Sequence, residues 1–119
     1  MSSQNSRGTA RIISQKDVAR GYREIRLDYT PGSAPAGLPE PGSFFTILPV
    51  NHPLQTMRRP FAYSGADDRG FSFIYEIRGD ATSDIAAMPE GGVLDWIGPL
   101  GNPFQRPAAG KRPVLVAGG

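Results

Sequence analysis

The sequence predicts a mainly β protein, a small six-stranded antiparallel Greek-key barrel with one short helix. Fifteen glycines and twelve prolines among 119 residues favour short strands joined by many turns over long helices. Residues 22–30 (YREIRLDYT) alternate between apolar and polar side chains, which is the period of a strand with one buried face. Only residues 80–92 have a convincing helical pattern, and the length suits a single hydrophobic core.

The first half of the chain is predicted to contain three strands. Residues 1–10 are expected to form a flexible tail, and a short strand is expected within residues 9–19. The alternating strand of residues 22–30 comes next. A loop rich in proline and glycine over residues 31–42 then leads to residues 43–50. Because this last run is almost entirely apolar, it predicts a strand buried on both faces.

Three more strands are predicted in the second half. The first begins at Arg58 or Arg59, and the second covers residues 71–79, where alternate aromatic side chains share one face. The third, over residues 93–104 (VLDWIGPLGNPF), ends in a rigid Gly-Pro loop that is expected to close the barrel. The single tryptophan, Trp96, is assigned to the core.

The short helix is predicted within residues 80–92 (DATSDIAAMPEGG). Thr82 or Ser83 is the expected N-cap, because a hydroxyl can accept a hydrogen bond from a first-turn amide. Asp84 adds negative charge to the first turn, where the helix dipole is positive. Pro89 is expected to end the helix.

The charge and the residue content exclude several kinds of protein. A net charge of +2 is too small for a polycation. The chain has no cysteine, and so it holds no disulfide and no thiolate-bound metal. Its only histidine, His52, forms neither a metal site nor a catalytic triad and is expected at the surface. With no signal peptide and no apolar run of membrane length, a cytoplasmic protein without a membrane partner is expected.

Two stretches carry candidate anion-binding chemistry. In residues 58–64 (RRPFAYS) an arginine pair precedes a proline-stiffened strand, which places cations suited to phosphate beside a flat aromatic surface. In residues 78–84 (RGDATSD) backbone amides and a hydroxyl converge at the start of a helix, where the dipole favours an anion. Taken alone, each stretch has a commoner structural interpretation, a solvated arginine pair and an ordinary N-cap.

The order and spacing of five motifs along the chain carry a family resemblance. These motifs are PGSFFTI, RRPFAYS, IYEIRGDATSDI, GPLGNPF and PVLVAGG. Together they resemble the ferredoxin-reductase-type FAD-binding domain, most closely that of the dihydroorotate dehydrogenase electron transfer subunit. The resemblance runs from about residue 11 to residue 119. GPLGNPF is the motif most specific for that subunit, whereas the Arg-Pro-aromatic strand marks the wider superfamily.

The resemblance implies an FAD site built from three elements, with no catalytic residue and no metal ligand in this chain. One strand pairs an arginine with the FAD diphosphate and lies against the flavin. A second strand runs along the flavin and its ribityl chain, and the start of a helix holds the diphosphate. The residues at these positions are Arg59, Pro60, Phe61 and Ala62, then Ile74, Tyr75 and Glu76, and finally Ala81 and Thr82.

Three of these positions depart from the family's pattern. Ala62 stands where a hydroxyl near flavin N5 is usual, and Ser64 lies about 6–7 Å further along the strand. Glu76 replaces a common arginine and adds a like charge near an anionic cofactor. Ala81 replaces a glycine, which matters only where a positive φ is required. These departures predict weaker FAD binding and altered reactivity at N5.

The resemblance also divides the chain and places it in a larger system. The FAD-binding barrel is assigned to residues 11–106, and residues 107–119 to a linker and the first strand of an α/β domain that binds NAD(P)H. In that system electrons pass from NAD(P)H through FAD and a 2Fe-2S cluster to a catalytic dihydroorotate dehydrogenase-type subunit. The chain alone is expected to bind FAD without turnover, and its unpaired apolar strand is expected to cause self-association.

Three alternatives remain open at this stage. The domain could serve a related sulfide reductase, sulfite reductase or hydrogenase system. An OB-like barrel could instead bind single-stranded nucleic acid on exposed aromatic platforms, although the alternation here buries the aromatics, and no nucleic-acid partner is expected. A third alternative is a docking module that has lost flavin binding through Ala62 and Glu76.

Overall fold

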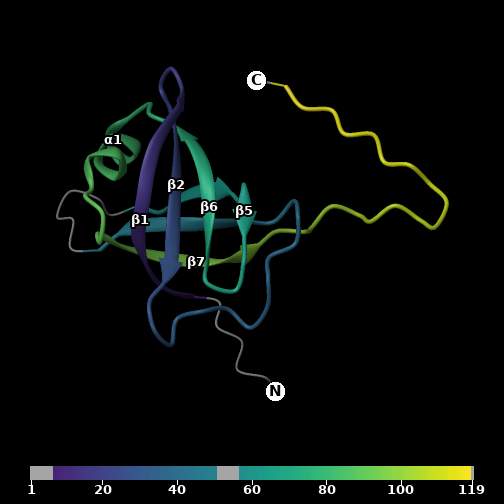
Figure 1. Ribbon diagram of the computed structural model, residues 1–119, viewed down its shortest axis with the longest axis horizontal. Coiled ribbons are helices and arrows are strands. Elements are labelled where there is room, and N and C mark those ends of the chain that lie inside the picture. The colour runs from purple at the N-terminus through teal and green to yellow at the C-terminus, as the bar shows by residue number, and fades with distance from the viewer. Residues whose placement is uncertain (1–6, 51–56, 119) are drawn as a thin grey trace.

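A single antiparallel sheet of seven strands carries the fold (Figure 1). The computed structural model describes residues 7–50 and 57–118. The prediction of a mainly β fold with one short helix is confirmed, and the strand beyond the six predicted is a two-residue strand of Gly65 and Ala66. The elements are β1 (Arg7–Ala19), β2 (Tyr22–Tyr29), β3 (Phe44–Pro49), β4 (Arg59–Ala62), β5 (Gly65–Ala66), β6 (Gly70–Glu76), α1 (Asp80–Ala87) and β7 (Val93–Leu100).

The order of the strands shows how the sheet curls. It runs β4-β3-β7-β1-β2-β6-β5, so that the last strand, β7, lies between β3 and β1. The two edges of the sheet curl toward each other. The ring of Phe61 in β4 stacks on that of Phe73 in β6, with ring centroids 4.6 Å apart. Backbone pairing does not join β4 to β6. The predicted barrel is therefore curled but open along one line, which we call the β4–β6 seam (residues 59–62 and 73–76).

Aromatic side chains fill the inner face of the curled sheet. The ring of Phe45, with no exposed surface, lies 4.4 Å from that of Phe71 and 4.6 Å from that of Tyr63. At the other end of the core, Trp96 is buried and its ring lies 5.4 Å from that of Tyr29. Tilted and edge-on contacts of this kind are the arrangements that aromatic quadrupoles favour. The assignment of Trp96 to the core is confirmed.

The structure corrects two expectations for the first half of the chain. The first strand begins at Arg7, where Arg7–Arg11 pair with residues of β7, so the expected tail of residues 1–10 already contains paired backbone. In β3, alternate residues such as Phe45 and Ile47 are buried while those between them are half-exposed. The expected burial on both faces is wrong, because the outer face of the curled sheet is only partly covered at this strand in the described part of the structure.

The helix begins earlier than the sequence pattern suggests. The N-cap is Gly79, not Thr82 or Ser83, and α1 ends before Met88. The hydroxyl of Thr82 accepts hydrogen bonds from the amides of Arg78 and Gly79, at 2.9 and 3.1 Å. The predicted hydroxyl therefore stabilises the start of the helix from inside the first turn.

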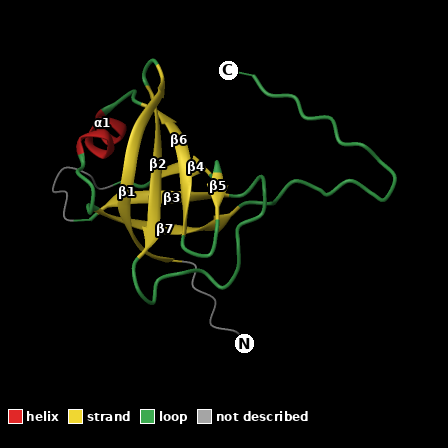
Figure 2. Cartoon of the chain, viewed as in Figure 1, coloured by secondary structure: helices red, strands yellow, loops and turns green. Residues whose placement is uncertain are grey.

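The chain after β7 leaves the barrel. Leu100 pairs with Phe44 in the sheet, so the first part of GPLGNPF is strand and not loop. The amide of Phe104 then donates to the carbonyl oxygen of Pro41 at 2.8 Å, beside Gly42 at φ +96°, where a Cβ would meet that amide at 2.7 Å. Beyond this anchor the segment runs away from the sheet (Figure 2).

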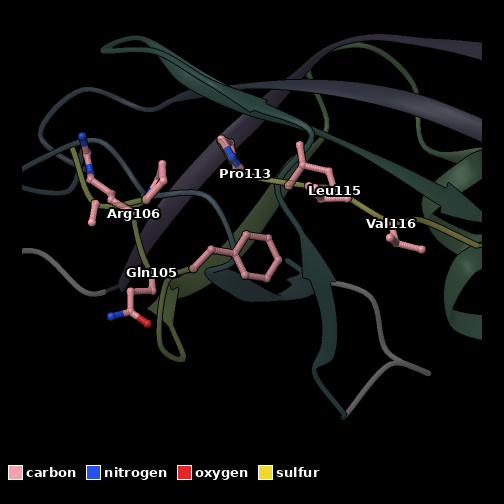
Figure 3. A pocket seen from close by; sticks show the side chains of 9 residues that line it. Gln105, Arg106, Pro113, Leu115 and Val116 are labelled. Carbon is pink, nitrogen blue, oxygen red and sulfur yellow. The ribbon is translucent and has the colours of Figure 1, made fainter. Parts of the chain in front are cut away.

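Residues 101–118 contain no strand. Val114, Leu115 and Val116 are 84–92% exposed. A hollow of about 670 Å³ in this region is lined only by residues from 104 to 116, with Arg106 and Leu115 among them (Figure 3). His52 lies outside the described residues. Among the described residues, no helix is long and apolar enough to cross a membrane.

Candidate functional site

Aromatic contacts show how the two strands of the β4–β6 seam face each other. Phe61 lies opposite Phe73, with ring centroids 4.6 Å apart, and Tyr63 lies opposite Phe71 at 5.4 Å. The two strands therefore run in opposite directions along the seam. It follows that Arg59, at the start of β4, lies toward the end where β6 leads into α1. The arginine pair and the start of α1, the two anion-binding features predicted from the sequence, thus lie toward the same end of the seam.

In β4 the predicted site residues divide between two faces. Phe61 is half-buried and its ring lies against the aromatic core. Pro60 and Ala62 are exposed, and alternation along the strand directs them to the outer face. The outer surface of β4 at the seam is therefore small and apolar, while its aromatic residue contributes mainly to the inner packing.

The structure distinguishes the two adjacent arginines. The guanidinium of Arg58 forms an ion pair with the carboxylate of Asp95 on β7 and is only 21% exposed. Arg7 approaches the same carboxylate at 3.5 Å. Arg59 is exposed and has no ion-pair partner among the described residues. Arg58 therefore has a structural partner, whereas Arg59 presents a cation to solvent.

In β6 the predicted residues also divide by face. Tyr75 points inward, is 3% exposed and donates a hydrogen bond to Oε1 of Gln15 at 2.6 Å. Burial raises the pKa of Tyr75. Ile74 is 48% exposed on the outer face. Glu76 shares that face and accepts a hydrogen bond from the hydroxyl of Tyr22 at 3.3 Å. The outer face of β6 is therefore apolar at its centre and acidic at its end.

The start of α1 offers backbone donors more than side-chain donors. The amides of Asp80, Ala81 and Thr82 lie in the first turn of α1, and first-turn amides have no acceptor within a helix. Ala81 lies inside the helix, so no positive φ is needed and alanine serves there as well as glycine. The Thr82 hydroxyl already accepts the amides of Arg78 and Gly79, so it is occupied locally.

A pair of hydroxyls marks the opposite end of the seam. The Oγ atoms of Ser64 and Ser72 lie 3.3 Å apart, and the amide of Ser64 donates to the carbonyl oxygen of Ser72 at 2.9 Å. A hollow of about 300 Å³ adjoins them, lined by residues 38–42 and 63–66. Ser72 was not among the predicted site residues, although its place one residue before Phe73 puts it on the outer face.

Sequence comparison finds relatives that are longer than this chain. No protein-family model matches the chain. It is 29% identical over 110 residues to the electron transfer subunit of dihydroorotate dehydrogenase B (NAD(+)) from Caldanaerobacter subterraneus subsp. tengcongensis, which covers 92% of this chain and 41% of the relative. It is 30% identical over 112 residues to the subunit of the same name from Bacillus cereus, which covers 91% of this chain and 42% of the relative.

Structural comparison finds the same fold in solved structures of reductases. A ferredoxin reductase of carbazole 1,9a-dioxygenase matches with a TM-score of 0.72 and 20% identity, over 90% of this chain and 33% of that chain. The cytochrome b5 reductase domain of Ulva prolifera nitrate reductase matches with a TM-score of 0.67 and 16% identity, over 85% and 44%. The chain therefore has the fold of a ferredoxin-reductase-type FAD-binding domain and is similar in sequence to part of the dihydroorotate dehydrogenase electron transfer subunits.

Proposed function

We propose that the chain binds FAD along the β4–β6 seam as the flavin domain of an electron transfer subunit. The observation that carries this proposal is the arrangement at one end of the seam. There the exposed guanidinium of Arg59 lies toward α1, whose first-turn amides have no acceptor within the helix. A cation and free backbone N–H groups together favour a diphosphate.

The rest of the seam suits the remainder of the cofactor. Its outer surface is apolar where Pro60, Ala62 and Ile74 face solvent, which favours contact with a flat ring system. Glu76 opposes an anion, although its carboxylate lies 3.9 Å from the guanidinium of Arg78. Asp80 adds a second negative charge in the first turn of α1. When bound, FAD supplies hydride and single-electron chemistry. The residues of this chain bind and orient it.

The relatives support a role in a longer electron-transfer chain. Their names describe electron transfer subunits of an NAD(+)-linked dihydroorotate dehydrogenase. For this chain we propose the same direction of flow, from NAD(P)H through FAD and a 2Fe-2S cluster to a catalytic dihydroorotate dehydrogenase-type subunit. We also propose that residues 114–116 pair within a parallel sheet of an NAD(P)H-binding domain in the longer protein. All three side chains are apolar and exposed, and a run of valine and leucine is typical of a strand that is buried in a parallel sheet.

The test compares the two adjacent arginines. FAD, FMN and riboflavin are titrated into the purified chain while flavin fluorescence is recorded. We expect FAD to bind more tightly than FMN, and FMN more tightly than riboflavin. Arg59→Met should weaken FAD binding by about tenfold to a hundredfold, the range expected for losing a charge-assisted hydrogen bond. Its effect on riboflavin should stay within about twofold, because riboflavin carries no phosphate.

Two controls separate binding from folding in this experiment. Arg58→Met should lower the melting temperature, because it leaves Asp95 without its nearest partner, but should leave FAD affinity within about twofold of the wild-type value. Arg11→Met removes an exposed arginine of β1 and controls for the loss of one positive charge. A folded wild-type chain that does not bind FAD would overturn the proposal and favour a docking role.

A further inference from the structure

Two side chains fasten the C-terminal end of α1 to the hairpin formed by β1 and β2. Nε2 of Gln15 donates to the carbonyl oxygen of Ile85 at 2.8 Å and to that of Met88 at 3.4 Å. Nη1 of Arg23 donates to the carbonyl oxygen of Ala86 at 2.9 Å. The last carbonyl groups of a helix lack the usual partners within the helix, and the hairpin donates to three carbonyl groups at this end. One of them, that of Ile85, also accepts the amide of Met88 at 3.1 Å.

The same glutamine also holds β6. Its Oε1 accepts the hydrogen bond from the hydroxyl of Tyr75 at 2.6 Å, so both ends of the Gln15 amide are used. The second side chain is oriented in turn, because Nε of Arg23 donates to Oδ1 of Asp17 at 2.9 Å. We call Gln15 and Arg23 the helix clasp. The helix clasp therefore joins the C-terminal end of α1 to the hairpin of β1 and β2, and Gln15 also joins that hairpin to the inner face of β6.

The helix clasp has a geometric consequence at the other end of the helix. With eight residues, α1 is about 12 Å long, and only Ala81 and Ile85 of the helix are buried. Besides these two, Ala86 and Met88 pack only partly buried against the core, so packing alone leaves a short helix some freedom to pivot on the sheet. The hydrogen bonds at its C-terminal end remove that freedom, and so they determine where its first-turn amides lie relative to β6 and the seam.

We propose that Gln15 and Arg23 are positioning residues of the cofactor site, which hold the start of α1 in register with the β4–β6 seam. This inference rests on the proposed function. Neither side chain belongs to the seam, and both hold α1. Gln15 also accepts a hydrogen bond from Tyr75 of β6, but Tyr75 is buried on the inner face. Their effect should therefore fall on the part of the ligand that meets the start of the helix, the diphosphate, and should spare the part that meets the strands, the flavin ring.

The experiment measures FAD and riboflavin affinities for five variants of the full chain. Gln15→Leu removes every hydrogen bond of the glutamine, and Gln15→Glu keeps an acceptor for Tyr75 but presents a carboxylate to the helix carbonyl groups. Arg23→Met removes the donor to Ala86, whereas Arg23→Lys restores a cationic donor. Lys16→Met is the matched control, because Lys16 neighbours Gln15 but pairs outward with Glu24 at 3.3 Å.

A positioning role predicts a selective loss. Gln15→Leu, Gln15→Glu and Arg23→Met should each weaken FAD binding by about tenfold and leave riboflavin affinity within about twofold. Arg23→Lys should recover most of the lost FAD affinity, and Lys16→Met should change neither ligand. Circular dichroism of each variant checks that the sheet is intact, and the two conservative variants carry the test where a non-conservative one does not fold.

Other outcomes overturn the inference. Unchanged FAD affinity in the folded Gln15 and Arg23 variants would show that the start of α1 is held by its buried side chains alone. An equal loss for FAD and riboflavin would show a general structural role without selectivity for the diphosphate. Both results leave the proposed function intact if the wild-type chain binds FAD. Absence of FAD binding by the folded wild-type chain would instead overturn the proposed function, and this inference with it.

Discussion

The inner face of the sheet and the segment of residues 113–117 have similar apolar composition but opposite environments. Phe45 and Phe73 have no exposed surface, whereas Leu115 and Val116 are 88% and 92% exposed. The difference lies in hydrogen-bond partners, because every inner residue belongs to a strand with a paired neighbour. An apolar run becomes a buried strand only where its backbone groups can be paired. Composition alone therefore does not separate the two regions.

Truncation of a ring on the inner face should produce the largest effect on stability. Phe45→Ala removes a ring that contacts those of Tyr63, Phe71 and Phe73. The free energy of unfolding should fall by about 3–5 kcal/mol, measured by urea denaturation. Phe104→Ala is the matched control, because Phe104 is 73% exposed, and it should cost less than about 0.5 kcal/mol. Equal losses in the two variants would contradict the comparison.

A polar cluster at the turn between β5 and β6 should give a smaller, pH-dependent effect. Arg26 donates to the carboxylate of Asp67 at 2.8 Å, and the amides of Arg69 and Gly70 donate to the same oxygen. The hydrogen bond from Arg26, followed by those amides, lowers the pKa of Asp67 to about 2. Since the pKa of an unfolded aspartate is about 3.9, the cluster stabilises the fold above about pH 4 and this contribution is lost as the pH falls toward 2.

The substitution Asp67→Asn tests this cluster directly. It should lower the melting temperature at pH 7, and the difference from the wild-type chain should shrink as thermal melts are repeated from pH 5 down to pH 2. Asp68→Asn, at the neighbouring exposed position, should leave the melting temperature unchanged. A difference that persists undiminished at pH 2 would show that the charge of Asp67 is not the source of the stabilisation.

Polar substitution of the exposed segment should have the smallest effect on stability. Val114→Ser, Leu115→Ser and Val116→Ser made together should change the free energy of unfolding by less than about 0.5 kcal/mol, because these side chains make little packed contact. The same variant should reduce self-association measured by light scattering. A loss of stability comparable to that of Phe45→Ala would show that the segment packs on the barrel. A wild-type chain that scatters as a clean monomer would contradict the predicted self-association.

Sequence reasoning predicted the parts of the fold that depend on local pattern. In β2 and β6 the alternation of side chains assigned the inward positions correctly, for example Ile25 and Phe73. The order of the motifs identified the fold that the structural neighbours share. Local pattern misled where a neighbour was needed. The apolar run of β3 predicted two buried faces, and the hydroxyl of Thr82 predicted an N-cap that Gly79 occupies.

The candidate site shows the same limit of prediction from local sequence pattern. The seven predicted residues of β4 and β6 divide between the two faces of the strands, since Phe61 and Tyr75 pack inward while Ala62 and Ile74 face solvent. Nothing in the dipeptide Arg58-Arg59 indicates which arginine is available to a ligand. That distinction depends on Asp95, which lies 37 residues further along the chain.

The sequence by itself determined the alternation of buried and exposed positions, the single helix and the family resemblance, because these follow from the order of residues within one segment. Only the tertiary structure decided that β4 meets β6 without pairing, that Arg59 has no partner among the described residues, and that Gln15 reaches Ile85 across 70 residues. The physical reason is that side-chain alternation is a property of a strand's own backbone, whereas pairing, ion pairs and helix anchoring arise only when segments distant in sequence are brought together.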